Sequence, residues 1–338
     1  MTIHSRGRPA SRFGGACAAL LATAVLASVG FGQEARAEIK EMSLQVAHIY
    51  DPGNIWYEVT EKLIEGVEAR TDGKVTFKVA ASGTTGTWAE SIEALQIGTN
   101  DIVIQSIGTL DRYDPLPGIE AFPYLIRDLD HFKALFYGPT GEELFAEIEE
   151  RTGFRIVGAG YRGARKLTSN RPVSTLEDLS GLKLRVPPLK MYRRTWELLG
   201  ASPVPMPFLE VFTSLQQGVI DGQENPLEVI ESKRLDEVQK YVVETDHVIG
   251  AMTFIFDAAR FASFPEELQQ ILIEEGDKAM LWGTDQMLKQ EADYKTTLTE
   301  RGMEFITPDV AAFRAAVAPI KDDFPELKDW VERINAME

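Results

Sequence analysis

The sequence predicts an α/β protein of two domains. Between residues 44 and 104 the sequence switches repeatedly between two patterns. Short apolar runs typical of strands are followed by stretches whose apolar residues have the spacing of a helix. A strand–helix repeat of this kind builds a parallel sheet with right-handed crossovers. A chain of 338 residues is also too long for one compact core, and residues 163–250 again mix strands with helices. We therefore expect a second α/β domain there.

The elements of the first domain follow in order along the chain. We expect strands at 44–48, 75–79, 101–104 and 154–160, and helices at 55–67 and 88–97. Residues 111–139 are rich in proline and aromatic residues, which we interpret as irregular packing. The carboxyl ends of parallel strands face the ligand crevice of such sheets. The polar and aromatic residues near these ends, which should lie beside one crevice, are His48, Tyr50, Trp88, Gln105 and Ser106.

In the second domain we expect helices at 191–199 and 208–217, each closed by a glycine. A short strand at 219–220 should lead into a turn formed by the sequence DGQENP. The run MTFIFDAARF, which follows Gly250, alternates like a strand and should return to the first sheet. Residues 265–301 have helical spacing without an internal proline, and they fit either two ordinary helices or one long helix.

Arg185 is the most informative polar residue of the chain. It lies in the alternating run Leu182–Val186, which reads as a strand that Pro187 and Pro188 end. Its guanidinium therefore stands at the carboxyl end of a strand, where it could hold a carboxylate with two parallel hydrogen bonds. The alternative is a surface ion pair, which is the commoner role of such an arginine.

Arg165 and Asn225 are possible helpers of Arg185. A second guanidinium and an amide could complete the shell of a bound carboxylate. Asn225 also precedes Pro226 and an apolar run, so it fits equally the N-cap of a helix that has proline at its first position. Of the aromatic residues, Trp88 and Phe208 stand at helix starts near the crevice and suit a pocket, whereas Trp196 has the spacing of a core residue.

The amino terminus predicts export. Three arginines precede an apolar run at 16–31, and Ala35-Arg36-Ala37 fits a signal peptidase site with cleavage before Glu38. The alternative, a membrane anchor, is weaker because the run is shorter than the roughly 20 residues of a span. The single cysteine, Cys17, lies in this leader, so we expect no disulfide in the mature protein. Without residues 1–37 the formal net charge is −20, which disfavours nucleic acid and anionic lipid as partners.

The residues predict no enzyme. The chain has no HExxH, paired-cysteine or GxSxG motif, and its four histidines are scattered. His48 is the one candidate base in the crevice, although a lone strand histidine is more often a hydrogen-bonded structural residue. We therefore expect no catalytic set, no metal and no cofactor.

Several segments together resemble one family. They are TSNRPV at 168–173, DLSGLKLRVP at 178–187, LGASPVPMPFLEVFTSLQQGVIDGQENP at 199–226, EVQKY at 237–241, AFPYLIRDLDHF at 121–132 and FPEELQQIL at 264–272. These segments are similar to the substrate-binding proteins of tripartite ATP-independent periplasmic (TRAP) transporters, DctP type. The resemblance implies a periplasmic binding protein fold whose cleft closes by a hinge, with one long C-terminal helix spanning both domains. It places domain I at 38–162 plus 251–285, and domain II at 163–250 plus 286–338.

The resemblance also implies a function and its residues. Arg185 would hold the ligand carboxylate, Arg165 and Asn225 would add hydrogen bonds, and Phe208 would stack on the carbon skeleton. The ligand would be a small organic acid, which a periplasmic monomer delivers to the small and large permease subunits. Polar groups beside tryptophan and tyrosine favour a sugar acid such as a uronate or aldonate. Lys190, Arg193 and Arg194 leave a C4-dicarboxylate open, and more distant alternatives are a secreted lyase or isomerase with His48 as base, or a sensor protein.

Overall fold

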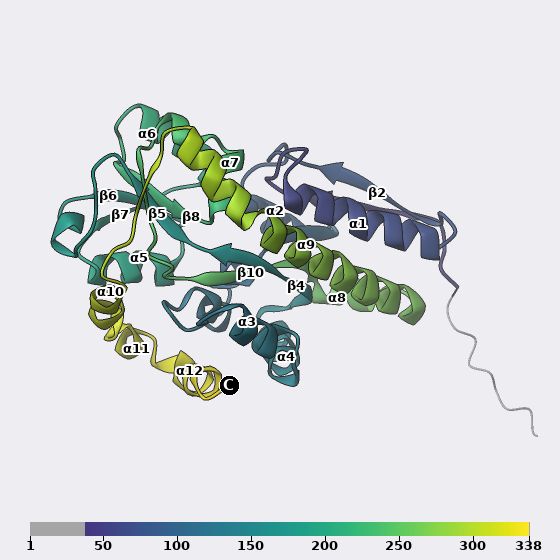
Figure 1. Ribbon diagram of the computed structural model, residues 1–338. Coiled ribbons are helices and arrows are strands. Elements are labelled where there is room, and N and C mark those ends of the chain that lie inside the picture. Colours follow the sequence, from purple (N-terminus) through teal and green to yellow (C-terminus); the bar gives the residue numbers. More distant parts are fainter. Residues whose placement is uncertain (1–37, 338) are drawn as a thin grey trace, which may run out of the picture. The chain divides into compact units, whose positions relative to one another are not determined.

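A computed structural model of the protein describes residues 38–337, and these residues contain two β-sheets with helices packed on them (Figure 1). The predicted signal peptide and Cys17 lie outside the described residues. We call the part built on the first sheet the first lobe and the part built on the second sheet the second lobe. No helix within residues 38–337 combines the length and the apolar character that crossing a membrane requires.

The first sheet has the predicted parallel core. Its strands, in spatial order, are β2 (Val75–Ala80), β1 (Met42–Ala47), β3 (Ile102–Ser106), β10 (Ile249–Asp257) and β4 (Phe154–Ala164). Strand β1 pairs in parallel with β2 and β3, as the strand–helix repeat predicts. Strand β10 returns from the second lobe and inserts antiparallel between β3 and β4, which confirms the expected return of the chain after Gly250.

The second sheet carries Arg185. Its strands, in spatial order, are β11 (Glu304–Ile306), β9 (Tyr241–Val243), β5 (Lys166–Ser169), β8 (Gly222–Asn225), β6 (Lys183–Val186) and β7 (Ser202–Pro205). The expected strand at 219–220 is wrong, because the strand is β8 and it takes up most of the predicted turn DGQENP. Its residues Gln223, Glu224 and Asn225 are all buried although none is apolar, because hydrogen bonds inside the protein satisfy them.

Most predicted helices are present. The helices before the last long one are α1 (Ile55–Arg70), α2 (Trp88–Gln96), α3 (Leu129–Phe136), α4 (Pro139–Thr152), α5 (Lys190–Leu198), α6 (Val211–Gln216), α7 (Leu227–Ser232) and α8 (Ala258–Ala262). The expected helix at 208–217 is divided into the 3-10 turn η4 (Phe208–Glu210) and α6. The interpretation of residues 111–139 as irregular missed α3, which Asp128 starts by accepting a hydrogen bond from His131 N at 2.8 Å.

Residues 266–300 form the single helix α9, which decides between the one-helix and two-helix alternatives (Figure 1). It packs along α1 and β4 of the first lobe and reaches α7 of the second lobe. The glycines inside it permit this close packing. A Cβ atom at Gly276 would lie 2.5 Å from Val157 Cγ1, and one at Gly283 would lie 2.5 Å from Val59 Cγ2.

The end of the chain leads from the second lobe back to the first. After β11 it forms α10 (Val310–Val317) and α11 (Ile320–Asp323) beside α5, and then α12 (Lys328–Asn335). Helix α12 contacts the first lobe, where His131 Nε2 lies 3.0 Å from Ile334 O and Trp330 Nε1 donates to Glu147 Oε2 at 2.9 Å. The domain boundaries expected from the sequence stay a prediction. We propose that the segment around α12, assigned there to domain II, packs as part of domain I.

Candidate ligand-binding site

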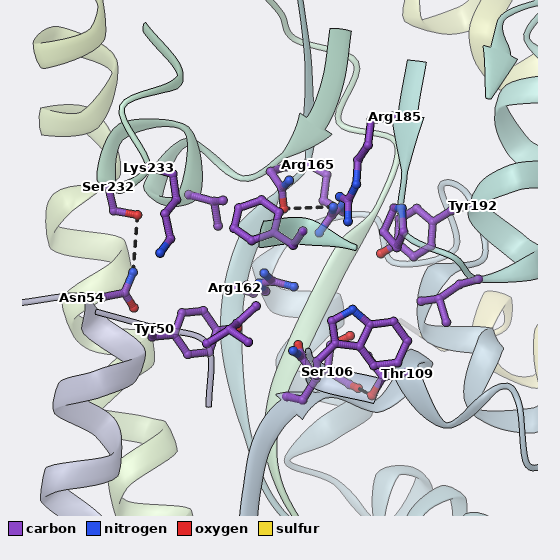
Figure 2. A pocket seen from close by; sticks show the side chains of 18 residues that line it. Tyr50, Asn54, Ser106, Thr109, Arg162, Arg165, Arg185, Tyr192, Ser232 and Lys233 are labelled. Carbon is purple, nitrogen blue, oxygen red and sulfur yellow. Dashed lines mark hydrogen bonds between the residues drawn. The ribbon is translucent and has the colours of Figure 1, made fainter. Parts of the chain in front are cut away.

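One cavity brings together residues of both lobes, and eight of the nine predicted site residues line it (Figure 2). Its empty space measures about 580 Å³, counted with the part that opens to solvent, which suits a small molecule. The predicted residues that line it are Tyr50, Trp88, Gln105 and Ser106 from the first lobe and Arg165, Arg185, Phe208 and Asn225 from the second. The exception is His48.

Arg185 is buried beside Met206 and Phe208. The side chain is 2% exposed, and its Nε and Nη2 donate to Met206 O at 3.0 and 2.8 Å. Its guanidinium lies 5.5 Å from the centre of the Phe208 ring. Burial lowers the pKa of Arg185 to about 9, so the group is still protonated at neutral pH. It makes no ion pair within the described part of the chain, which contradicts the surface ion-pair alternative and suits an anionic ligand.

Arg165, by contrast, already has an anionic partner. Its Nε lies 2.5 Å from Glu224 Oε2 and its Nη2 lies 2.9 Å from Glu224 Oε1, a bidentate pair. His247 Nε2 lies 3.0 Å from the same Oε2, and its Nδ1 lies 2.9 Å from Thr245 Oγ1. Burial alone would raise the pKa of Glu224, but the charge of Arg165 and the contact with His247 lower it to about 2. Arg165 therefore stands beside the cavity as half of a neutralised pair.

Asn225 connects this pair to the strand. Its Oδ1 accepts a hydrogen bond from Arg165 Nη2 at 3.1 Å, and its Nδ2 donates to Gln223 Oε1 at 2.6 Å. The N-cap alternative is wrong, because Asn225 belongs to β8 and the cap position of α7 is Pro226. The asparagine side chain thus faces the cavity with its amide oriented by two neighbours.

We expect Asn225→Asp to weaken binding of an acid by at least tenfold, about 1.4 kcal/mol. The new carboxylate would repel an anion in the cavity and would no longer donate to Gln223. Calorimetric titration measures the effect. Asn335→Asp, the same change at an exposed position, is the matched control. Equal affinities for the two variants would contradict a role of Asn225 in the site.

The first lobe contributes neutral polar groups. Tyr50 hydroxyl donates weakly to Met252 Sδ at 3.5 Å, and burial raises the pKa of Tyr50 to about 12, so it stays a phenol. Gln105 Oε1 accepts from Ser106 N at 2.9 Å, and Thr109 Oγ1 donates to Ser106 O at 2.6 Å. With Trp88 beside them, these groups suit a ligand with several hydroxyls along an apolar face.

His48 is not among the residues that line the cavity. Its Nδ1 accepts a hydrogen bond from Tyr50 N at 3.2 Å, and its ring meets the edge of Tyr57 with centres 5.5 Å apart. Within residues 38–337 its Nε2 has no hydrogen-bond partner. This placement favours the structural interpretation of His48 over a ligand contact.

Burial lowers the pKa of His48 from 6.5 to about 4, with a consequence for acid stability. The unfolded chain takes up this proton at a higher pH than the folded one, so the protein should lose stability as the pH falls from about 6.5 to 4. The loss from this residue is up to about 3 kcal/mol. Denaturant unfolding at pH 8, 6 and 4 should show a smaller loss in His48→Gln than in the wild type. Identical pH dependence in the two would contradict the lowered pKa.

Sequence reasoning missed several lining residues, chiefly Asn54, Thr109, Arg162, Tyr192 and Lys233. Arg162 directly precedes the expected second domain at 163–250, and Tyr192 lies in the expected helix at 191–199, but neither position marks a site residue. The cations that kept a C4-dicarboxylate open do not line the cavity. Arg193 pairs with Glu197 at 2.9 Å and Arg194 with Asp323 at 2.7 Å, while Lys190 is exposed.

Two further contacts beside the cavity join the first lobe to α7 and its C-cap residue. Lys233 Nζ lies 2.5 Å from Asp51 Oδ2, and Asn54 donates to Glu228. Within residues 38–337, no three His, Cys, Asp or Glu side chains gather in a way that could hold a metal ion.

Two α/β lobes around a cavity that holds a buried arginine without an ion pair among residues 38–337 define a solute-binding protein. A family model described as bacterial extracellular solute-binding protein, family 7 (DctP), matches residues 46–327, and the chain belongs to this family. The predicted TRAP family and the two-domain α/β fold with its long helix are thereby confirmed.

Solved structures and relatives agree with this assignment. A TRAP periplasmic solute-binding protein from Roseobacter denitrificans, with bound L-galactonate, is 35% identical with a TM-score of 0.82 and matches 87% of this chain and 99% of its own. One from Xanthobacter autotrophicus, with bound β-D-galacturonate, is 29% identical with a TM-score of 0.84 and matches 87% and 100%. The sialic acid-binding protein SiaP of Vibrio cholerae is 30% identical over 80% of this chain and 85% of its own.

Proposed function

We propose that the protein captures a sugar acid, such as an aldonate or a uronate, in the periplasm and delivers it to the membrane permease of a TRAP transporter. The observation that carries this proposal is Arg185, a buried guanidinium that faces the cavity without a carboxylate partner among the described residues. A ligand carboxylate would supply the missing charge through charge-assisted hydrogen bonds.

The rest of the cavity supports a hydroxylated acid. Phe208, held beside Arg185, offers an aromatic face to the carbon skeleton. On the opposite wall Gln105, Ser106 and Thr109 offer polar atoms to hydroxyl groups, and Trp88 lies beside them. Relatives with the same fold hold galactonate and galacturonate, which have this combination of one carboxylate and several hydroxyls.

Each predicted residue keeps a proposed role. Arg185 binds the carboxylate, and Asn225 completes its shell with a hydrogen bond. Arg165 orients Asn225 and adds little net charge, because Glu224 neutralises it. Tyr50 and the other first-lobe residues contact the hydroxyls of the ligand that lie away from its carboxylate. His48 positions Tyr50 by accepting a hydrogen bond from the Tyr50 backbone N–H.

Ligand capture would require the lobes to open and close, and the structure has the contacts of a closed form. The pair Lys233–Asp51 and the hydrogen bond from Asn54 to Glu228 both join the two lobes beside the cavity. A ligand that contacts both lobes would favour the closed form by its differential affinity. Export through a signal peptide cleaved before Glu38 would place the protein where the family works.

A thermal-shift screen of residues 38–338 tests the proposal. The panel holds uronates, aldonates, C4-dicarboxylates, keto acids and neutral sugars. A sugar acid at 100 times its Kd should stabilise the protein by about 2.7 kcal/mol, whereas neutral sugars should leave the melting temperature unchanged. Stabilisation by neutral sugars or by C4-dicarboxylates alone would contradict the proposal. Recovery of the bound acid chemically unchanged would separate a binding protein from a lyase or isomerase.

A further inference from the structure

The charges that line the cavity do not balance. Four cationic side chains line it: Arg162, Arg165, Arg185 and Lys233. Arg165 is paired with Glu224 and Lys233 with Asp51. Arg162 and Arg185 have no ion pair anywhere in the described chain. In a protein of formal net charge −17, two uncompensated guanidinium groups facing one cavity leave room for two anionic groups.

Arg162 stands at the end of β4, close to where the chain leaves the first sheet. Its side chain is half-buried, and its Nε is fully buried without a hydrogen-bond partner among residues 38–337. Figure 2 shows it extending among the lining residues, between Tyr50 and Arg165. A buried donor without an acceptor costs free energy, and a bound anion would remove this cost.

Two buried carboxyl groups, those of Glu120 and Glu228, interact electrostatically with Arg162 but form no ion pair with it. Both oxygens of Glu120 are occupied by backbone donors, Gly108 N at 2.7 Å and Ala251 N at 2.9 Å. Burial raises the pKa of Glu120, although these hydrogen bonds and the charge of Arg162 oppose the shift.

Glu228 is engaged in the same way. Its Oε1 accepts from Asn54 and from Ser232 Oγ, the latter at 3.4 Å. Burial raises the pKa of Glu228, and the charge of Arg162 offsets this rise only in part. The ionised carboxylate of Glu228 is therefore disfavoured. Neither carboxyl forms an ion pair with Arg162, so its donors stay available to a ligand.

We propose that Arg162 is a second anion-binding group and that the favoured ligand is a sugar diacid, an open-chain polyhydroxy acid with a carboxylate at each end. One carboxylate binds Arg185 and the other binds Arg162. The hydroxyls between them meet Gln105, Ser106 and Asn54. This inference rests on the proposed function and narrows its substrate class. Specificity arises as a difference of affinities, because a monoacid leaves Arg162 without its partner.

Calorimetric titration with matched six-carbon ligands tests the proposal. The probes are galactarate and galactonate, with glucarate and gluconate as a second stereochemical series. In at least one series the wild-type protein should bind the diacid at least tenfold tighter than the monoacid. In Arg162→Gln the ratio of the two affinities should fall at least tenfold, because the variant loses only the partner of the second carboxylate.

Two further variants make the result interpretable. Arg162→Lys keeps the charge and should retain most of the preference for the diacid. Arg171→Gln, at an exposed arginine outside the cavity, should leave the ratio unchanged. Melting temperatures without ligand confirm that each variant is folded.

The outcomes separate this inference from the function on which it rests. If monoacids bind as tightly as diacids in both series, or if Arg162→Gln weakens both alike, the role of Arg162 is overturned while sugar-acid binding stands. If neither the sugar acids of the thermal-shift panel nor galactarate and glucarate bind the wild type, the proposed function fails together with the inference.

Discussion

Replacing Arg185 with glutamine is expected to weaken sugar-acid binding by roughly 30- to 5,000-fold, the equivalent of about 2–5 kcal/mol for truncating one partner of a buried charge pair. Glutamine can still donate a hydrogen bond to Met206 O, so the change removes chiefly the charge and the bidentate geometry. Calorimetric titration of the wild type and the variant with the same acid measures the loss.

The fold should survive this change. Burial already disfavours the charged form of Arg185 in the empty cavity, as its lowered pKa of about 9 indicates. The melting temperature without ligand should therefore stay the same or rise. Arg193→Gln, an exposed arginine paired with Glu197 outside the cavity, is the matched control and should bind normally. Unchanged affinity in a folded Arg185→Gln variant would end the carboxylate-binding role.

Glu224→Gln is expected to lower the free energy of unfolding by about 3–5 kcal/mol, because it leaves Arg165 charged and buried without its partner. Glu224 is fully buried and also bonds His247. Its pKa of about 2 lies below the ordinary 4.5, so its contribution is present above pH 4.5 and is lost as the pH falls towards 2. Denaturant unfolding at pH 7 measures the effect.

Two controls sharpen that experiment. Glu65→Gln breaks an exposed pair with Lys62 and should cost less than about 1 kcal/mol. Changing Arg165 and Glu224 together to methionine removes both charges and should recover much of the loss. A loss below about 1 kcal/mol for Glu224→Gln alone would contradict the buried pair.

The sequence predicted those strands and helices whose apolar residues follow the spacing of that element. The parallel strands β1 and β2 and the returning strand β10 were found because their apolar residues alternate, and β3 was found as a short continuous apolar run. Strand β8 was missed because Gln223, Glu224 and Asn225 are polar. Their burial depends on partners from β5 and from residue 247, which no local pattern reveals.

The site, too, was predictable from the sequence only in part. Arg185 was predicted from its place at a strand end before two prolines, and the cavity does contain it. Whether an arginine is free or paired was not predictable, because the answer depends on tertiary neighbours. The structure pairs Arg165 with Glu224 and leaves Arg185 and Arg162 without ion pairs among residues 38–337. His48 was expected at the crevice on the same reasoning, but the residues after it form the wall.

The most direct test of a carboxylate-binding cavity compares one sugar acid with its uncharged counterpart. The acid that gives the largest thermal shift and the corresponding neutral sugar or sugar alcohol are titrated into wild-type protein by calorimetry. The arrangement of Arg185 predicts binding of the acid at least 100-fold tighter than the neutral compound, a difference of about 2.7 kcal/mol. Equal affinity for the two would contradict it, because the hydroxyls and not the carboxylate would then provide the binding energy.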